Sequence, residues 1–509
     1  MIIGIDLGTT YSLGATLNVD HQPILLPDNT DKNGLYTPSV LHINGNNAFV
    51  GQSVMHMLEQ NPDLSVIRFF KRSLGENKPL HMDGQGDVWY AESVAALVLK
   101  KIKYDAEIYA SNTVEGAVIT IPAHFSDAQR KSVLHAAKMI DLSVLGLVEE
   151  PVAAAMHYGI SNKASDQNIL VYDLGGGTFD ATVLSMSDRA FKVLSKDGLT
   201  DLGGKEFDEA IAGIVYQQFE KSLGRPVEFS GRKAQQLRVF SEEVKIELSS
   251  PGTQYVSRMC LLGDDNIEVF ISRKEFERAI TSHVERTLKI LRRCIASANL
   301  QEEDIDVLLL VGGSSMVPFI QQHIKATMPK LADKIRFQDP MKAVVYGAAI
   351  YARMLSGKDQ PGNNMDIPSE LKGVTGYNLA VRAIDSESGR TILDIIIPKN
   401  RPIPLKVKKT YYTGPNNDGK MRIELVQFIE DNDVKTMGIL NVGPLPTHEA
   451  NYPIEITLEY TEDSVVVLQA YDPKTGRELE KTFGKEGMGA NYLATQKKLV
   501  QKAFINNVI

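Results

Sequence analysis

Two stretches of the chain repeat one pattern, in which an apolar run ends in an aspartate and a glycine turn with threonine follows. Residues 2–12 read IIGIDLGTTYS, and residues 169–180 read ILVYDLGGGTFD. Glycines let backbone N–H groups approach an anion, threonine hydroxyls add donors, and a carboxylate at a strand end can hold magnesium directly or through water. One such turn is usually a hairpin. Two this similar indicate a clamp for the phosphate tail of a nucleotide.

A third glycine turn, Gly312-Gly313, follows the apolar residues 307–311 and precedes a predicted helix. The helix N-terminus there could receive a phosphate or a ribose, although a lone Gly-Gly pair is also compatible with a simple tight turn. The chain has no G-x-x-x-x-G-K-[ST] motif and no G-x-G-x-x-G after a strand, and Gly203-Gly204-Lys205 lacks the other P-loop residues. Three glycine turns therefore favour a nucleotide bound between two lobes.

The elements that must position these turns alternate between strands and helices through about residue 355, which predicts an α/β fold. Residues 118–122 predict a strand, and Ser126 and Gln129 form a capping box for a helix that runs to about Ile140. The small residues at 344–352 predict a helix that packs closely against a neighbour.

Beyond a polar Gly/Pro/Asn-rich stretch at 356–368, the hydrophobic period changes to two. Residues 421–428 and 454–460 alternate as half-buried strands do, and turn clusters separate them. We therefore expect a domain boundary at this stretch and an all-β sandwich after it. The tail at 491–509 is expected to form one short helix and no more.

Composition narrows the class of protein. A chain of 509 residues is too long for a single hydrophobic core, so more than one domain is expected. A net charge of −8 argues against a dedicated nucleic-acid-binding surface. Cys260 and Cys294 cannot make a disulfide framework and fit a reducing compartment. The first strand begins at residue 2, which leaves no room for a secretory signal, and no apolar run reaches the ~18 residues of a membrane span. We expect a cytoplasmic protein without nucleic-acid or membrane partners.

The motifs resemble those of the DnaK-type 70-kDa heat-shock proteins (Hsp70). The resemblance covers residues 1–355 in the family's order and spacing, whereas hexokinases and actins share the clamp but not this set. The matching segments are residues 5–12, 37–39, 70–72, 150–155, 172–180, 202–208, 245–250 and 310–315.

The resemblance implies an α/β actin-like ATPase domain of two lobes at 1–355, a linker at 356–373 and a β-sandwich peptide-binding-like domain at 374–490. It implies slow hydrolysis of ATP to ADP, with Mg²⁺ as cofactor and K⁺ as a further candidate. Because the given sequence ends about 20 residues after the last predicted strand, we expect no helical lid.

The resemblance also implies site roles. Asp6 and Asp173 would position hydrated magnesium, and Asp180 would shape the ion environment. Lys71 would stabilise charge on the γ-phosphoryl group, and Glu150 would orient or deprotonate the attacking water. Asp173 and Thr178 join Lys71 and Glu150 in the catalytic set. The remaining nucleotide-binding residues would be Gly8, Thr9, Thr10, Tyr11, Gly175, Gly176, Gly177, Gly203, Gly204, Glu242, Lys245, Ser249, Gly312 and Gly313. For Glu242 and Lys245, a surface ion pair on a helix is the alternative.

Departures from the family pattern occur at positions near the expected adenine site and at positions that transmit signals between the domains. Met316 stands where many relatives have arginine, and Met341 replaces an acidic residue. Gly146 takes the place of the arginine that receives a J-domain co-chaperone, and a neighbouring Asn–Glu pair reads Glu149-Glu150, whereas Pro122 is kept. The linker at 369–373 supplies only one leucine, Leu371, so we expect weak coupling between the domains.

In the sandwich, six residues align with a groove for an extended peptide: Val381, Ala383, Ile384, Tyr411, Met421 and Ile423. The alternative is that they are ordinary core residues. Met421 stands where a smaller branched residue is usual, which would narrow the apolar pocket.

Two functions follow from the resemblance. One is an ATP-dependent chaperone that binds extended apolar peptides. The other is an ATP-binding interaction module that docks one dedicated partner, without general folding activity. A J-domain co-chaperone and a nucleotide exchange factor are candidate partners, although the J-docking residues are altered. A small-molecule kinase is disfavoured, because residues 366–509 do not resemble a second catalytic lobe.

Overall fold

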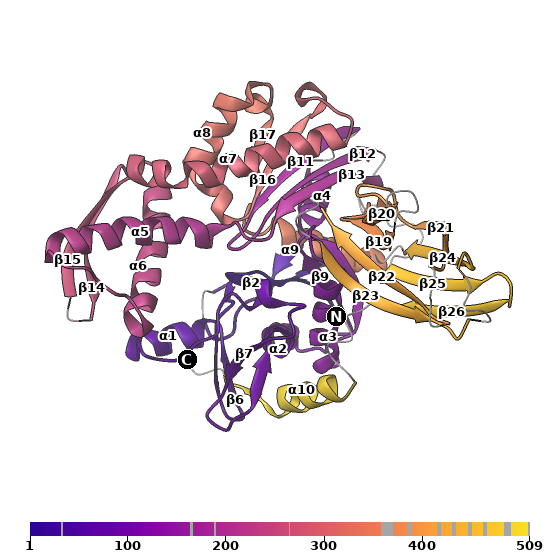
Figure 1. Ribbon diagram of the computed structural model, residues 1–509. Helices are drawn as coiled ribbons and strands as arrows, with labels where there is room; N and C mark the ends of the chain where they lie inside the picture. Colours follow the sequence, from indigo (N-terminus) through magenta and orange to yellow (C-terminus); the bar gives the residue numbers. More distant parts are fainter. Residues whose placement is uncertain are drawn as a thin grey trace.

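The computed structural model describes twelve segments of the chain. These are residues 1–31, 34–162, 166–187, 190–263, 265–357, 370–384, 389–414, 419–429, 434–445, 450–461, 466–482 and 490–506. Residues 1–357 form two α/β lobes, and a β-sandwich lies beside them (Figure 1). Among the helices of these segments, we find none with the length and hydropathy of a membrane span.

The first lobe is built on a six-stranded sheet with β4 beside β2 and the order β10-β9-β1-β2-β3. Its strands are β1 (Ile2–Asp6), β2 (Tyr11–Leu17), β3 (Pro23–Leu25), β4 (Thr37–Pro38), β9 (Gly116–Ile121) and β10 (Val144–Glu149). Around it lie β5 (Leu41–Asn44), β6 (Asn47–Val50), β7 (Pro79–Met82), β8 (Val88–Tyr90), α1 (Gln52–Gln60), the 3-10 turn η1 (Phe70–Ser73), α2 (Ala91–Ala110) and α3 (Asp127–Met139). The predicted capping box at Ser126 and Gln129 is confirmed, and α3 ends one residue earlier than predicted.

The second lobe is built on a sheet with the order β17-β16-β11-β12-β13-β18. Its strands are β11 (Gln167–Leu174), β12 (Phe179–Ser187), β13 (Ala190–Leu199), β16 (Val307–Val311), β17 (Ile335–Phe337) and β18 (Glu370–Lys372). The lobe also holds α5 (Gly204–Leu223), α6 (Gly231–Ser249), the hairpin β14 (Tyr255–Leu262) and β15 (Asp265–Ser272), α7 (Arg273–Ser297), α8 (Pro318–Thr327) and the 3-10 turns η2 (Glu302–Asp304), η3 (Gly313–Met316) and η4 (Pro329–Lys334).

Two helices, α4 (Glu150–Ser161) and α9 (Ala343–Leu355), pack against each other beside the two sheets. A Cβ on Gly347 would lie 1.8 Å from the carbonyl oxygen of Ala153, and a Cβ on Gly4 would lie 2.2 Å from the nitrogen of Ala349. Only glycine fits these approaches. The prediction of a closely packed small-residue helix is therefore confirmed.

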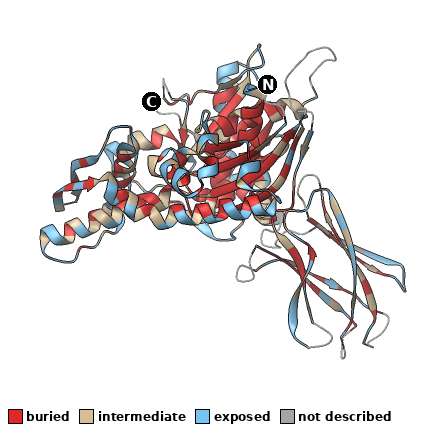
Figure 2. Ribbon diagram, turned by 90° about the horizontal axis from the view of Figure 1, so that it is seen from above, coloured by how far each residue is buried: buried red, intermediate tan, exposed pale blue. Residues whose placement is uncertain are grey.

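The sandwich consists of two antiparallel sheets with the orders β20-β19-β22-β23 and β21-β24-β25-β26. The strands are β19 (Asn378–Ile384), β20 (Thr391–Ile397), β21 (Leu405–Tyr412), β22 (Met421–Phe428), β23 (Lys435–Val442), β24 (Pro453–Tyr460), β25 (Val466–Asp472) and β26 (Arg477–Thr482). Alternate residues of both sheets meet in one core, which Figure 2 shows as the buried interior of the projecting unit. The predicted period of two is confirmed.

The end of the expected linker is a strand. β18 pairs in parallel with β13, with Leu371 opposite Phe191. Leu371 packs against a buried cluster of the α/β unit, while Glu370 and Lys372 stay exposed and form an ion pair of 3.0 Å. The charged side chains of Glu370 and Lys372 therefore remain solvated. Residues 358–369 of the expected linker lie outside the described residues.

The C-terminal tail forms α10 (Ala490–Lys502) and a short strand, β27 (Phe504–Ile505). The helix packs on α2 and α3 (Figure 1), and β27 extends the β6 edge. Lys100 donates hydrogen bonds of 2.9 and 2.7 Å to the carbonyls of Val500 and Ala503, which are both buried. The prediction of one helix and no more is wrong, because the last residues complete a sheet of the first lobe.

Candidate active site

The two glycine turns face each other across the lobes. The first lies between β1 and β2, and the second lies between β11 and β12. A Cβ on Gly176 would lie 2.0 Å from Thr10 Oγ1, and a Cβ on Gly177 would lie 2.7 Å from Thr9 Cγ2. A Cβ on Gly8 would lie 1.9 Å from the carbonyl oxygen of Tyr11. The two turns thus form a cradle lined by backbone atoms, and side chains at the glycine positions would fill it. A cradle of this kind suits an anion.

Lys71 and Glu150 form a buried ion pair beside this cradle. Lys71 lies on η1, against which α2 packs, and Glu150 begins α4. The distance from Lys71 Nζ to Glu150 Oε1 is 2.5 Å. Burial alone would lower the pKa of Lys71, but the Glu150 and Asp6 carboxylates raise it above its ordinary value. Burial raises the pKa of Glu150 to about 7 against the pull of Lys71. The sequence-predicted catalytic pair is therefore in contact.

Three aspartates gather at the same strand ends. Asp173 and Asp180 are cross-strand partners on β11 and β12, and Asp6 accepts a hydrogen bond of 2.9 Å from Thr120. Burial, followed by the repulsion of Glu150 and Asp180, raises the pKa of Asp173 well above its ordinary value. Asp173 Oδ2 is buried and accepts no hydrogen bond from the described residues.

A buried carboxylate oxygen without a donor, in a group of like charges, fits a cation. Within the described segments, no group of three or more His, Cys, Asp or Glu side chains is placed to hold a metal ion. Carboxylate oxygens are the hard donors that magnesium prefers, and these aspartates would hold the hydrated ion through its water molecules. The chemistry of the donor set fits that ion.

The third glycine turn adjoins the second. Gly312 has φ 83°, and a Cβ there would lie 2.4 Å from the carbonyl oxygen of Leu174. Ser314 Oγ donates to the carbonyl of Gly175 at 2.8 Å, which ties the turns together. The Met341 sulfur lies 2.8 Å from the position of a Cβ on Gly313. Met316 is 51% exposed.

The α6 residues predicted to hold the adenosine lie close to α5. Lys245 pairs with Asp208 at 2.7 Å rather than with Glu242, so the surface ion pair considered as an alternative is not made. Ser249 Oγ donates to the Lys245 carbonyl at 2.7 Å. Burial raises the pKa of Asp208 to about 6, with Lys245 opposing it. Asp208 belongs to a motif that the sequence indicated, but its contact with Lys245 was not predicted.

Two side chains of the first lobe, Phe69 and Arg72, make further contacts with the second lobe that sequence patterns did not reveal. Arg72 donates to both carboxylate oxygens of Glu206 at 2.8 Å and to the Gly177 carbonyl at 2.6 Å. The ring of Phe69 faces two cations, with centroid distances of 5.8 Å to Lys205 Nζ and 5.5 Å to Arg238 Cζ. Arg72 and Glu206 lie in the matching segments 70–72 and 202–208, but no sequence pattern paired them. We call these contacts the interlobe clasp.

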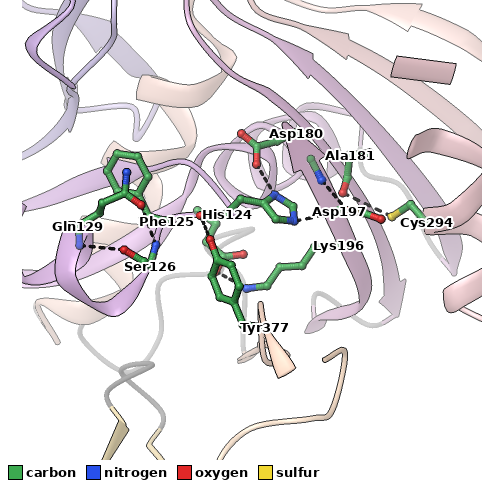
Figure 3. Close-up of polar contacts among 12 residues, drawn as sticks. His124, Phe125, Ser126, Gln129, Asp180, Ala181, Lys196, Asp197, Cys294 and Tyr377 are labelled. Atoms are coloured by element: carbon green, nitrogen blue, oxygen red, sulfur yellow. Dashed lines mark hydrogen bonds and ion pairs between the residues drawn. The ribbon is translucent and has the colours of Figure 1, made fainter. Parts of the chain in front are cut away.

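A polar network joins the site to the sandwich side of the molecule (Figure 3). His124 Nδ1 lies 2.8 Å from Asp180 Oδ1, and the carbonyl of His124 accepts a hydrogen bond from the Tyr377 hydroxyl. Asp197 is buried and pairs with Lys399 at 3.0 Å and with Arg293. Lys399 of the sandwich region and Arg293 of α7 thus share the Asp197 carboxylate.

Glu149, one of the departures from the family pattern, is also part of this network. Its carboxylate accepts from Arg130 at 2.7 Å and from Lys196 at 2.6 Å. Burial would raise the pKa of Glu149, but Lys196 and Arg130 hold it below its ordinary value. The Lys196 backbone N–H also donates to Asn400 Oδ1 at 3.1 Å. The two adjacent glutamates therefore serve different partners.

The candidate groove residues separate into two groups. Val381 and Ile423 are 3% and 1% exposed and belong to the sandwich core, which is the alternative that the sequence left open. Tyr411 donates to Asp394 at 2.7 Å, and Met421 packs against the core. Ala383 is half-buried, whereas Ile384 is 74% exposed. Their role in peptide binding stays a prediction.

Comparison with known proteins agrees with the geometry. The family model described as "Hsp70 protein" matches residues 2–83 and 77–503. The chaperone protein DnaK of Thermosipho melanesiensis is 34% identical over 487 residues, which cover 94% of this chain and 79% of that protein. The chaperone protein DnaK of Thermosipho africanus is 33% identical with the same coverage. These matches support a chaperone function and the family's ATPase chemistry with ATP, ADP and Mg²⁺. The chain belongs to the Hsp70 family.

Proposed function

We propose that the protein is a DnaK-type chaperone that hydrolyses ATP slowly and couples hydrolysis weakly to the binding of extended polypeptide segments. The observation that carries this proposal is the buried Lys71–Glu150 pair beside two facing glycine turns. A lysine held charged and a glutamate whose pKa is about 7 are suited to phosphoryl charge and to a water proton.

In this mechanism, Thr9, Thr10 and the backbone of the second glycine turn bind the phosphates. Lys71 exchanges Glu150 for the γ-phosphoryl oxygens, which frees the Glu150 carboxylate to orient the attacking water and accept its proton. A magnesium ion held by Asp6, Asp173 and Asp180 would neutralise phosphate charge. The interlobe clasp keeps the two halves of the site together while the bond to the leaving diphosphate breaks.

We assign the coupling to the domain interface rather than to the linker. Leu371 is the only apolar side chain that the described linker residues bring to the α/β unit. The Lys399–Asp197 ion pair and the Tyr377–His124 hydrogen bond connect the sandwich region to the strands and turns that carry the site. A state of the sandwich that strains these contacts would shift the site with it.

A second candidate function is an interaction module that docks one dedicated partner. Two features of the structure bear on it. Val381 and Ile423 are taken up by the sandwich core, and a Cβ on Gly146, in place of the J-docking arginine, would lie 2.7 Å from Leu355 Cδ1.

Steady-state ATP hydrolysis across a titration with an unfolded peptide tests the proposal. We expect slow basal hydrolysis that peptide raises by less than about threefold, a small effect by the standard of allosteric coupling. Lys399→Glu should reduce the stimulation, whereas Thr410→Glu, at an exposed position of β21, should not. Hydrolysis without any response to peptide would support the interaction module instead.

A further inference from the structure

A cavity of about 650 Å³ lies between the site and the sandwich. Its inner end is formed by Thr9, Lys71 and Thr178, which belong to the candidate phosphate site. Its outer wall is formed by Gln427, Thr436 and Met437 from β22 and β23. The cavity therefore begins where the terminal phosphate would sit and ends against the sandwich.

The interlobe clasp borders the site next to this cavity, and Arg72 belongs to both. Arg72 bridges Glu206 and the Gly177 carbonyl, and Phe69 lies between two cations of the second lobe. These contacts join the lobes next to the second glycine turn. A phosphate ion formed at Lys71 would have to break them, or pass the bound diphosphate, to leave in that direction.

Charge in the cavity favours an anion at its inner end. Lys71 and Arg72 line that end, and Lys435 approaches from the sandwich, whereas Glu76 and Asp127 are the acidic lining residues. Asp127 is itself paired with Lys131 at 2.7 Å. Four other lining residues of the cavity appear in Figure 3 beside the network that joins the site to the sandwich: Phe125, Ser126, Gln129 and Tyr377.

We propose that this cavity is the exit for inorganic phosphate and that the β22–β23 edge of the sandwich is its gate. The proposal rests on ATP hydrolysis as proposed above. A bond forms between the water oxygen and the γ-phosphorus, the bond from that phosphorus to the bridging oxygen breaks, and the water proton passes to Glu150. The phosphate then leaves through the cavity while ADP keeps its place, so docking of the sandwich slows product release.

Single-turnover experiments on the full chain separate release from chemistry. Rapid chemical quenching measures hydrolysis of ATP, and a fluorescent phosphate sensor measures release in the same samples. Thr436 is exposed on β23 and bonds to Glu424 at 2.8 Å, so Thr436→Trp adds bulk to the gate without entering the sandwich core. Thr410→Trp, on an exposed position of β21, is the matched control.

We expect Thr436→Trp to slow phosphate release at least about threefold with hydrolysis unchanged, and the control to match the wild type. Lys399→Glu, which sets a carboxylate against Asp197, should loosen the sandwich and speed release. Release at the wild-type rate in both Thr436→Trp and Lys399→Glu would overturn the proposal. So would a fall in hydrolysis equal to the fall in release. Absence of hydrolysis in the wild type would refute the proposed function, and the exit with it.

Discussion

The C-terminal segment should stabilise the first lobe, and Val500→Ala measures by how much. Val500 on α10 is fully buried in the core of that lobe. Truncation to alanine removes two carbons, worth about 0.8 kcal/mol each, and leaves a cavity, so we expect a loss of about 2–3 kcal/mol. Val19→Ala is the matched control, because Val19 is 90% exposed.

The chain contains one tryptophan, Trp89, which offers a local probe of this effect. Trp89 is 1% exposed and lies on β8, where Gln496 of α10 donates to the Val88 carbonyl at 3.0 Å. Its fluorescence in a urea titration follows the first lobe alone, which matters because chains of several units do not unfold in one step. With a slope of about 2–3 kcal/mol per molar urea, the midpoint should fall by about 1 M. An unchanged midpoint in Val500→Ala would refute the packing of α10 as a structural part of this lobe.

Three further predictions concern buried charge and coupling. Burial raises the pKa of Asp105 to about 6, so the unfolded chain loses this proton first and stability should fall as pH rises from about 4 to 6; Asp105→Asn should flatten that part of a stability-against-pH curve. Glu149→Ala leaves Arg130 and Lys196 buried without their carboxylate and should lower the free energy of urea unfolding by about 3–5 kcal/mol. Leu371→Asp should leave peptide stimulation of hydrolysis, itself below about threefold, nearly unchanged, and strong stimulation abolished by that change would contradict our view of the linker.

Local patterns predicted the elements and the facing turns well. The aspartate–glycine turns, the Ser126 capping box and the small-residue helix α9 each depend on neighbours a few residues apart, and the structure has all of them. The roles of Lys71 and Glu150 were predicted from the family resemblance rather than from spacing, and their direct contact, across 79 residues of sequence, is seen only in the structure. These features are predictable because a tight turn, a helix N-terminus and a close helix contact each restrict the residue types at the positions that form them.

Contacts between distant segments were not predictable in the same way. The sequence showed that the linker supplies one leucine but not that it forms a strand. An edge strand buries only alternate side chains, so Leu371 packs on the α/β unit while Glu370 and Lys372 face solvent. The tail gave a helical pattern, but pairing of β27 with β6 depends on an edge far away in sequence. Period-two alternation also cannot separate a groove from a core, which is why Val381 and Ile423 were open to both interpretations.

The measurement that tests the central claim most directly is single-turnover hydrolysis of ATP by the full chain with magnesium, compared with Lys71→Ala. The full chain is needed because α10 and β27 pack on the first lobe. We predict slow hydrolysis by the wild type and a rate at least about tenfold lower in the variant, with ATP still bound, since Lys71 acts chiefly on the transferring phosphoryl group. Equal rates in the two proteins, or no hydrolysis by the wild type, would contradict the account.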